Sequence, residues 1–327
     1  MPAHIFVLDE TNYKICTTRG IVGLPKGNTP KTQHELLSRM AIIKDKDHVL
    51  FYVTEAKELR GVWKAVGEPF YEETTVWEDD TYPIRFRIDC TEYNFANSLR
   101  LNDIYDLRNS GKLWAWSLRR NNNATNAAFS IPNSEYDILF QEYLKINPFE
   151  INKAVIMKPY NVVEPNLYGQ LAMQSGGKKP YEASLVSLLF RALVNGEFKD
   201  IFGNYTDYIS YVPTNLGTEM DVLLFFTNPK LIHQIMSYEI IEVKADRFDS
   251  KALRQLIGYE SWFIHNKVHG DMNMVRVSAV AKRYDMDVIN YVKNRKIFEG
   301  KEIKLFTYDV SDNGKLMLNN VNSEKEQ

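Results

Sequence analysis

The sequence predicts a protein of the α/β (α+β) class that is built from two domains. The chain has 327 residues, which is long for one compact domain and sufficient for two. Its apolar content of 44% allows a separate core in each half. The first half is rich in strand patterns, whereas the second half alternates strand patterns with helix patterns, as α/β layers do.

In the first half, short apolar runs between turn residues predict a sheet. A glycine- and proline-rich loop over 20–30 leads into a helical pattern over 32–40. The stretch 83–90 alternates with a period of two, which places Arg85 and Arg87 on the face away from the core. Mixed strands with short helices favour a small β-barrel flanked by helices. The expected strands are 4–8, 13–17, 48–54, 61–66 and 83–90.

A change of composition separates the two halves. Prolines and glycines recur between 148 and 180 without a sustained periodicity, and such a stretch predicts a connecting arm. We therefore assign a first domain to residues 1–148, a linker to 149–178 and a second domain to 179–320.

The second half predicts a mixed sheet flanked by helices. Apolar residues recur with helical spacing in three segments, and apolar runs of strand length lie between these segments. Strands that alternate with helices in this way build a layered α/β domain. The expected helices are 181–194, 250–266 and 285–293, and the expected strands are 219–226, 238–245, 274–281 and 303–308.

Composition and charge exclude several classes of protein. The formal net charge of -2 excludes binding to nucleic acid by bulk charge alone, so any nucleic-acid surface must be local. Two cysteines, Cys16 and Cys90, are too few for a disulfide framework, and we expect two buried free thiols in a reducing compartment. The sequence shows no signal-peptide pattern and no apolar run that could span a bilayer. We therefore expect a cytoplasmic protein without a membrane partner.

One strand of the second half carries charges in an apolar setting. In the run YEIIEVKA, Glu242 and Lys244 alternate with Val243, so both charges point to one face of the strand. Burying charge is costly unless the charges are paired or coordinate a metal ion. The pattern therefore predicts a chemical site on this face of the strand.

A second apolar run, DVLLFF, begins with Asp221. If the two strands form a hairpin with a loop over 227–237, Asp221 lies next to Glu242. Two carboxylates at one end of a sheet suit Mg²⁺ or Mn²⁺, and the carbonyl oxygen of Val243 is then the expected third ligand. Beside such a metal, Lys244 can stabilise a pentacovalent phosphate or help to activate the attacking water.

Three further residues complete the candidate site, and one choice stays open. Glu182, at the start of its helix, can project toward the strand ends as a ligand, although the helix dipole alone also favours an acidic residue there. Gln255 and Tyr259 are four residues apart on one helix face and can reach phosphate or the lysine. Glu219 can share the face of Asp221, so the choice between these two carboxylates as metal ligand is not settled by sequence.

This ordered set resembles the PD-(D/E)XK nuclease superfamily over roughly residues 178–310. One departure is Met220, which precedes the strand aspartate where the superfamily pattern has proline. The resemblance implies a restriction-endonuclease-like sheet flanked by helices, Mg²⁺ or Mn²⁺ as cofactor, and hydrolysis of phosphodiester bonds. The residues that carry it are Glu182, Asp221, Glu242, Lys244, Gln255 and Tyr259.

The first half carries a recognisable order of strands and loops in the stretches 6–28, 48–77 and 82–89. It resembles the PUA-like group that includes the EVE and YTH domains. The resemblance implies a pocket of aromatic side chains that holds a nucleobase, often a methylated one. Trp77 matches one cage tryptophan of YTH domains, and Val22 stands where many of them carry a second. Trp63 is a further candidate, with a place in the core as its alternative.

A base reader joined to a nuclease is the architecture of modification-dependent restriction endonucleases of type IV or type IIM. We therefore expect a DNA endonuclease directed by N6-methyladenine or by a modified cytosine, with a homodimer for double-strand cuts. Arg119 and Arg120 lie in a basic, polar loop that can contact phosphates or simply be solvated. The alternatives are a structure-specific DNA-repair nuclease and a non-catalytic nucleic-acid-binding protein with a decayed nuclease fold.

Overall fold

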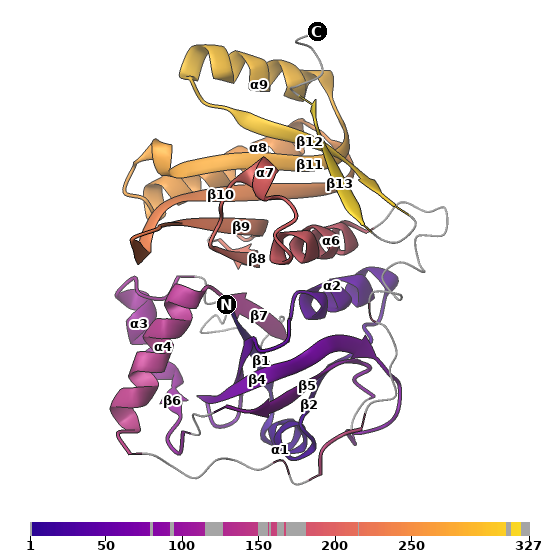
Figure 1. Ribbon diagram of the computed structural model, residues 1–327, viewed down its shortest axis with the longest axis vertical. Helices are drawn as coiled ribbons and strands as arrows, with labels where there is room; N and C mark the ends of the chain where they lie inside the picture. Colours follow the sequence, from indigo (N-terminus) through magenta and orange to yellow (C-terminus); the bar gives the residue numbers. More distant parts are fainter. Residues whose placement is uncertain are drawn as a thin grey trace. The chain divides into compact units, whose positions relative to one another are not determined.

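The computed structural model describes residues 2–78, 81–91, 95–114, 127–149, 156, 158–161, 167, 181–214, 216–311 and 315–321, with the backbone alone at 232 and 233. The chain divides into two compact units, Met1–Gln174 and Ser175–Gln327, and each is organised around its own sheet (Figure 1). The mixed α/β class predicted from the sequence is confirmed. The border between the units falls within the stretch 149–178 that composition predicts as a linker.

The N-terminal unit contains an open sheet. Its strands are β1 (Ala3–Leu8), β2 (Ile21–Leu24), β3 (His48–Val53), β4 (Glu58–Tyr71), β5 (Ile84–Cys90), β6 (Leu99–Arg100) and β7 (Ala128–Ile131). They follow the order β2-β5-β4-β3-β1-β7, with β6 paired to β4. Only β1 and β3 run parallel among these described pairs. The predicted barrel is corrected, because β2 and β7 form the two ends of the described path and do not pair with each other.

The helices described in this unit are α1 (Glu10–Arg19), α2 (Pro30–Ala41), α3 (Leu101–Asn109) and α4 (Asn133–Ile146). The prediction of a strand at 13–17 is wrong, because this segment lies inside α1. Asp9 caps the helix by accepting a hydrogen bond from a first-turn backbone N–H at 2.7 Å, and Gly20 ends it with a φ of 62°. These end signals outweigh the short apolar alternation. Cys16 is a buried free thiol on this helix, whereas the free Cys90 is half-buried.

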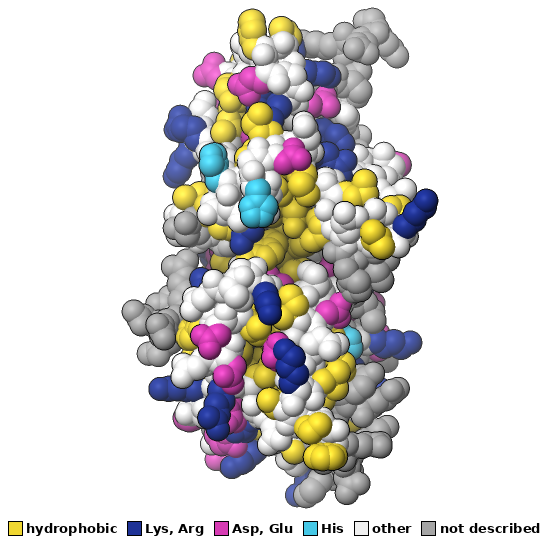
Figure 2. All heavy atoms as spheres, turned by 90° about the vertical axis from the view of Figure 1, so that its left-hand side faces the viewer, with side chains coloured by type: hydrophobic (Ala, Val, Ile, Leu, Met, Phe, Trp, Pro, Cys, Tyr) yellow, Lys and Arg dark blue, Asp and Glu magenta, His cyan; other side chains and the backbone are white. Residues whose placement is uncertain are grey.

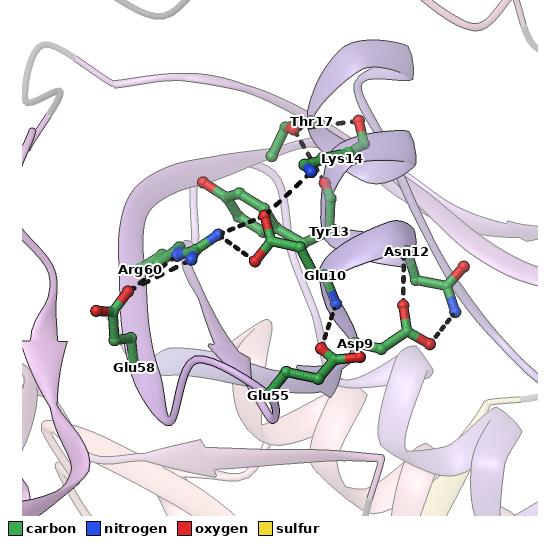
Figure 3. A network of polar contacts seen from close by, with 9 residues as sticks. All are labelled: Asp9, Glu10, Asn12, Tyr13, Lys14, Thr17, Glu55, Glu58 and Arg60. Carbon is green, nitrogen blue, oxygen red and sulfur yellow. Dashed lines mark hydrogen bonds and ion pairs between the residues drawn. The ribbon is translucent and has the colours of Figure 1, made fainter.

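A network of charges around Arg60 ties α1 to β4 (Figure 3). The Arg60 guanidinium lies 2.9 Å from a carboxylate oxygen of Glu10 and 3.4 Å from one of Glu58. It also lies 4.8 Å from the centroid of the Tyr13 ring. Glu55 accepts a hydrogen bond from the backbone N–H of Glu10 at 2.7 Å and so occupies the positive end of the helix. The network therefore fixes the helix against the sheet.

A buried polar trio fixes the edge strand β7 of the same sheet. His4 on β1 lies 2.9 Å from Ser130 Oγ on β7 through Nδ1, and 2.9 Å from Asp47 Oδ2 through Nε2. The three residues are at most 7% exposed. Buried polar groups destabilise a fold unless they are hydrogen-bonded, and here His4 contacts both Ser130 and Asp47 Oδ2, while Asp47 Oδ1 has no hydrogen-bond partner among the described residues.

The C-terminal unit contains a mixed sheet. Its strands are β8 (Asp207–Pro213), β9 (Glu219–Asn228), β10 (Leu231–Phe248), β11 (Val275–Tyr284), β12 (Ile303–Val310) and β13 (Leu316–Asn320), in the order β13-β12-β11-β10-β9-β8. The strands β10, β11 and β12 are parallel, and the other described pairs are antiparallel. The helices are α6 (Glu182–Val194), α7 (Lys199–Phe202), α8 (Ser250–Asn266) and α9 (Met286–Glu299), with a 3₁₀ turn at Met272–Met274.

The helices α6 and α8 cover opposite faces of this sheet (Figure 1). The apolar side of α6 packs into one core with Ile241 and Val243 of β10. Phe263 of α8 instead packs against Tyr238, with 4.7 Å between the ring centroids. Tyr238 shares its face with Glu242, because alternate residues of a strand point to the same side. The carboxylate of the candidate site therefore lies on the side of the sheet that α8 covers.

The predicted hairpin of β9 and β10 is confirmed, with a shorter turn. β9 ends at Asn228 and β10 begins at Leu231, whereas the sequence predicts a loop over 227–237. The strands continue through polar residues because backbone pairing, which any residue but proline can make, extends a hairpin. The helix α8 begins at Ser250 as predicted, since Asp249 caps its first turn. No helix in the described part of the chain is both long and apolar enough to cross a membrane.

Candidate active site

The charged residues predicted from sequence meet at one end of the hairpin. Ile241 of β10 pairs with Val222 of β9, so the next positions along the two strands, Glu242 and Asp221, are neighbours. The backbone N–H of Val243 donates a hydrogen bond to Asp221 Oδ2 at 2.7 Å. The fold thus places two carboxylates from different strands side by side.

Lys244 joins these carboxylates to the helix α6. Its Nζ atom lies 2.8 Å from Glu242 Oε1 and 3.0 Å from Glu182 Oε1. It also donates to the carbonyl oxygen of Val243 at 3.2 Å. The side chain of Glu182 is 45% exposed, that of Lys244 is 20% exposed, and that of Glu242 is fully buried. The site therefore extends from a buried carboxylate, Glu242, to a solvent-exposed one, Glu182.

Burial and like charge shift the protonation of both inner carboxylates. Burial raises the pKa of Glu242 to about 7, against the opposing effect of Lys244. Burial, and next the charge of Glu242, raises the pKa of Asp221 well above its usual range. Burial opposes the charged form of Lys244, but the surrounding carboxylates outweigh it and raise its pKa. Shifts of this kind are frequent at functional sites, because a site must hold charge where water is excluded.

The donor set fits a hard divalent cation. Glu242 Oε2 is buried and accepts no hydrogen bond from any described residue, so this oxygen could bind a cation. Among the described residues, no group of three or more His, Cys, Asp or Glu side chains is placed to hold a metal ion. A cation at this site would therefore also need backbone or water oxygens as ligands. A cation here would bind Asp221, Glu242, the Val243 carbonyl oxygen and water. Mg²⁺ and Mn²⁺ accept such a mixture of two carboxylates with water.

Gln255 and Tyr259 of α8 act on the site indirectly, through the backbone of β9. The amide of Gln255 donates to the Tyr259 hydroxyl at 2.8 Å, and this hydroxyl donates to the backbone carbonyl of Glu219 at 2.7 Å. The sequence predicts contacts of this pair with phosphate or Lys244, but the Tyr259 side chain is fully buried and its hydroxyl is used on β9. The pair thus anchors β9 two residues before Asp221. The sequence did not decide between Glu219 and Asp221 as metal ligand. Asp221 accepts a hydrogen bond from the backbone of β10.

The three aromatic-pocket candidates of the N-terminal unit are all buried. Trp77 is 2% exposed, Val22 is 1% exposed and Trp63 is 7% exposed. The Trp77 ring lies edge-on to Tyr82, with 5.3 Å between centroids, and the Arg85 guanidinium lies over it at 5.2 Å. In this arrangement one face of Trp77 is occupied by a planar side chain of the protein itself.

Arg85 is a buried charge that sequence periodicity misplaced. The prediction that it faces away from the core is wrong, because its side chain is fully buried. It donates to the carbonyl oxygens of Thr81 at 2.6 Å and Tyr82 at 2.9 Å, and to the hydroxyl of Tyr160 at 3.2 Å. Burial lowers its pKa. The loop before β5 folds over this face of the sheet and encloses the guanidinium. The alternation of residues along a strand does not predict that a loop covers one of its faces.

The phosphate-contact candidates Arg119 and Arg120 lie outside the described residues. Their proposed contact with DNA therefore stays a prediction. In the C-terminal unit, by contrast, the structure brings together four of the six predicted catalytic residues, Glu182, Asp221, Glu242 and Lys244, whereas Gln255 bonds the Tyr259 hydroxyl, which contacts the backbone of β9. The sequence signal for Asp221, Glu242 and Lys244 was a charged residue within an apolar strand. Arg85 shows the same signal, and there too the charged side chain is buried.

Comparison with known proteins gives partial likenesses. No protein-family model and no curated protein matches the chain. A complex of EndoMS with double-stranded DNA matches 35% of this chain and 41% of its own, at 19% identity and a TM-score of 0.26. A repair endonuclease from Pyrococcus abyssi matches 35% and 44%, at 18% identity and 0.25. A hypothetical protein from Leishmania major matches 45% and 96%, at 12% identity and 0.32. The chain thus spans less than half of the two endonucleases, and every TM-score is below 0.5.

Proposed function

We propose that the protein is a metal-dependent DNA endonuclease whose active site contains Asp221, Glu242 and Lys244, with Glu182 at its exposed edge. One observation carries the proposal. Two buried carboxylates and a lysine converge at the end of one hairpin, and a buried Glu242 oxygen has no hydrogen-bond partner among the described residues. Other buried carboxylate oxygens, such as Glu239 Oε2, also lack a hydrogen-bond partner, so it is the convergence of Glu242 with Asp221 and Lys244 that supports the proposal.

Each residue has a defined part in hydrolysis. A divalent cation, when bound by Asp221 and Glu242, polarises the phosphate and lowers the pKa of a water molecule. Lys244 donates to a non-bridging phosphate oxygen, where negative charge grows as the water oxygen bonds to phosphorus and the bond to the sugar oxygen breaks. Glu182, the exposed carboxylate, holds the lysine at 3.0 Å before substrate arrives and is placed to take the water proton. The residues thus bind the cation, orient the attacking water and neutralise the growing negative charge on the phosphate.

The N-terminal unit is proposed to select a modified base, with N6-methyladenine first and a modified cytosine second. Trp77 already holds a planar group on its ring face, the guanidinium of Arg85 at 5.2 Å. A flipped-out base has the same flat shape and stacks on aromatic rings with a free energy of roughly 1–3 kcal/mol. Base entry then requires Tyr82, in the loop before β5, and the Arg85 guanidinium to move away from the ring, because Trp77 is only 2% exposed.

The test is cleavage of matched duplexes that differ in one modified base, with and without Mg²⁺ or Mn²⁺. Lys244→Ala should keep the fold and DNA binding but reduce cleavage by a factor of roughly 10² to 10³, the usual effect of one group aimed at the transition state. Lys230→Ala is the matched control, because this lysine is exposed in the turn at the other end of the same hairpin. Full activity of Lys244→Ala would refute the assignment of the site.

The same assay separates the alternatives. Metal-dependent cleavage that ignores base modification but depends on branched or mismatched structure would favour a DNA-repair nuclease. Binding without cleavage under any metal would favour a non-catalytic protein that has lost the nuclease activity. For double-strand cuts two sites must act together, and we propose that a homodimer supplies them.

A further inference from the structure

The exposed face of α8 carries no carboxylate. Glu260 is the sole acidic residue of this helix, and it is buried against Arg295 of α9 at 2.7 Å. Each of the other described α-helices carries at least one acidic side chain that is not buried. Figure 2 shows the Lys and Arg side chains of the C-terminal unit, in its upper half, interspersed with Asp and Glu. In a chain with a net charge of -2, a helix face without acidic residues is therefore a local feature.

One stripe of this face is basic and polar. Lys251, Arg254, Gly258, Ser261 and His265 succeed one another at intervals of three, four, three and four residues, which places them on one side of the helix. We call these five residues the α8 stripe. All but Gly258 are exposed, and none of the five forms an ion pair with a described residue. The charges of Lys251 and Arg254 are therefore available to a partner.

Two residues of the α8 stripe oppose the stability of their own helix. Lys251 lies in the first turn, where the helix dipole favours an acidic residue. Lys31 has the same place in α2, but Glu35 lies one turn later there, at 3.9 Å. Gly258 lies in the helix interior, where glycine is less favourable than alanine. A Cβ atom at this position would meet nothing within 4 Å, so packing within the protein does not require the glycine. Residues that weaken their own element are expected at functional surfaces.

The α8 stripe adjoins the candidate active site. Gln255 follows Arg254 directly and donates to the Tyr259 hydroxyl at 2.8 Å. Burial raises the pKa of Tyr259, and the charges of Glu242 and Asp221 act in the same direction. The flank of α8 next to the stripe therefore lies close to both carboxylates of the site.

We propose that the α8 stripe binds the phosphate backbone of the DNA beside the scissile bond, with Lys251 and Arg254 on successive phosphates of one strand. The inference rests on the proposed nuclease function and extends it to the substrate contact. The two residues are about 4.5 Å apart along the helix axis. Successive phosphates of one strand are roughly 3.4 Å apart along the duplex axis, a difference that long side chains can span. Because it has no side chain, Gly258 lets the sugar–phosphate backbone approach the helix closely.

Binding of duplex DNA by the full-length protein, without metal, tests the two charges. Fluorescence anisotropy is measured on duplexes of about 20 base pairs, with and without one N6-methyladenine, over a series of salt concentrations. Lys251→Ala and Arg254→Ala should each weaken binding about two- to tenfold and reduce the slope of log K against log salt by about 0.9. The factor should be the same on both duplexes, since phosphate contacts carry no sequence information. Lys293→Ala is the matched control, because this lysine is exposed on α9 and forms no ion pair with a described residue, and it should keep the wild-type slope.

Gly258→Ala separates binding from stability. Alanine favours the helix, so the melting temperature should rise by about 2–4 °C. DNA binding should nevertheless weaken about threefold or more, because the added methyl group stands where the DNA backbone approaches. Asn290→Ala, at an exposed position of α9, is the matched control. It also improves helix propensity, and it should leave DNA binding unchanged.

The results distinguish this inference from the proposed function. If the wild type cuts DNA with Mg²⁺ but Lys251→Ala and Arg254→Ala keep its affinity and salt slope, the α8 stripe is not the phosphate site and the proposed function stands. A Gly258→Ala variant that is more stable and binds DNA as tightly as the wild type overturns the close approach at that residue. If the wild type neither binds nor cuts DNA, the proposed function fails, and this inference fails with it.

Discussion

Glu242 is one of two carboxylates, with Asp221, that couple the candidate site to pH. Burial raises its pKa from the ordinary 4.5 to about 7. Between these two values the folded protein binds a proton that the unfolded chain releases. Without metal, this group therefore adds stability at low pH, and that contribution is lost as pH rises through 7. A bound cation reverses this pH dependence of stability, because the cation binds the ionised carboxylate.

We predict that the affinity for Mn²⁺ falls as pH is lowered. A proton and the cation compete for Glu242, so below about pH 7 the apparent affinity should drop by roughly tenfold per pH unit for each proton displaced. Isothermal titration calorimetry at pH 6, 7 and 8 measures both the affinity and the protons released. Glu242→Gln removes one of the two titrating ligands, so it should bind the cation weakly and release fewer protons on binding, with the remaining pH dependence due to Asp221. An affinity that is flat from pH 6 to 8 in the wild type would contradict the assignment of Glu242 as a ligand.

At the scale of the element, α8 acts on the site through the backbone of β9. The Tyr259 hydroxyl bonds the carbonyl oxygen of Glu219, and Asp221 follows two residues later on the same strand. A helix that is capped by Asp249 and packed on the sheet is a rigid support. The position of Asp221 relative to Glu242 thus depends on a contact that touches neither carboxylate.

We predict that Tyr259→Phe weakens metal binding more than it weakens the catalytic step. The change leaves the Glu219 carbonyl without its donor, which costs about 1–3 kcal/mol of unfolding free energy and loosens the start of β9. Cleavage rates measured against Mn²⁺ concentration should therefore show a shift to higher metal, with most of the maximal rate recovered at saturation.

Tyr143→Phe is the matched control for this prediction. Tyr143 is also fully buried and donates its hydroxyl to a strand carbonyl, that of Leu59, at 2.6 Å, but in the N-terminal unit. It should lower the melting temperature without shifting the metal dependence. A Tyr259→Phe enzyme whose maximal rate collapses at every metal concentration would show instead that the hydroxyl acts on substrate.

Periodicity predicted the elements of the C-terminal unit better than those of the N-terminal unit, for physical reasons. The strands around Val222 and Ile241 are continuous apolar runs buried on both faces, and such runs are easily read. The short helix that contains Cys16 carries little periodicity, and its cap at Asp9 was the stronger signal. Arg85 is buried because the loop directly before β5 and the Tyr160 hydroxyl enclose its guanidinium, and strand alternation alone does not predict this cover.

At the scale of the molecule, two compact units divide the proposed work between recognition and hydrolysis. Each unit has its own sheet and its own buried core. The two proposed sites share no element, since Trp77 belongs to the first unit and Lys244 to the second. Variants in one unit should therefore change one function and spare the other.

We predict that Trp77→Phe removes the preference for a modified base and leaves the metal-dependent cutting activity. Phenylalanine keeps a ring in the buried site, so the fold is retained, but it offers less stacking area to a base. Cleavage rates on modified and unmodified duplexes, measured at two salt concentrations, should become equal in this variant. The phosphate contacts that govern salt dependence should be unchanged, because they do not involve this ring.

Two further variants complete this test of separable functions. Lys244→Ala should still bind the modified duplex in preference to the unmodified one, although it cuts neither. Trp63→Phe alters a tryptophan that is also buried in the N-terminal sheet, at 7% exposure, and should keep the preference if Trp77 is the base-stacking residue. If Trp63→Phe loses the preference and Trp77→Phe keeps it, the pocket lies at Trp63. If both variants keep the full preference, neither ring stacks on the base, and selection of the modified base must come from other residues or from the DNA structure itself.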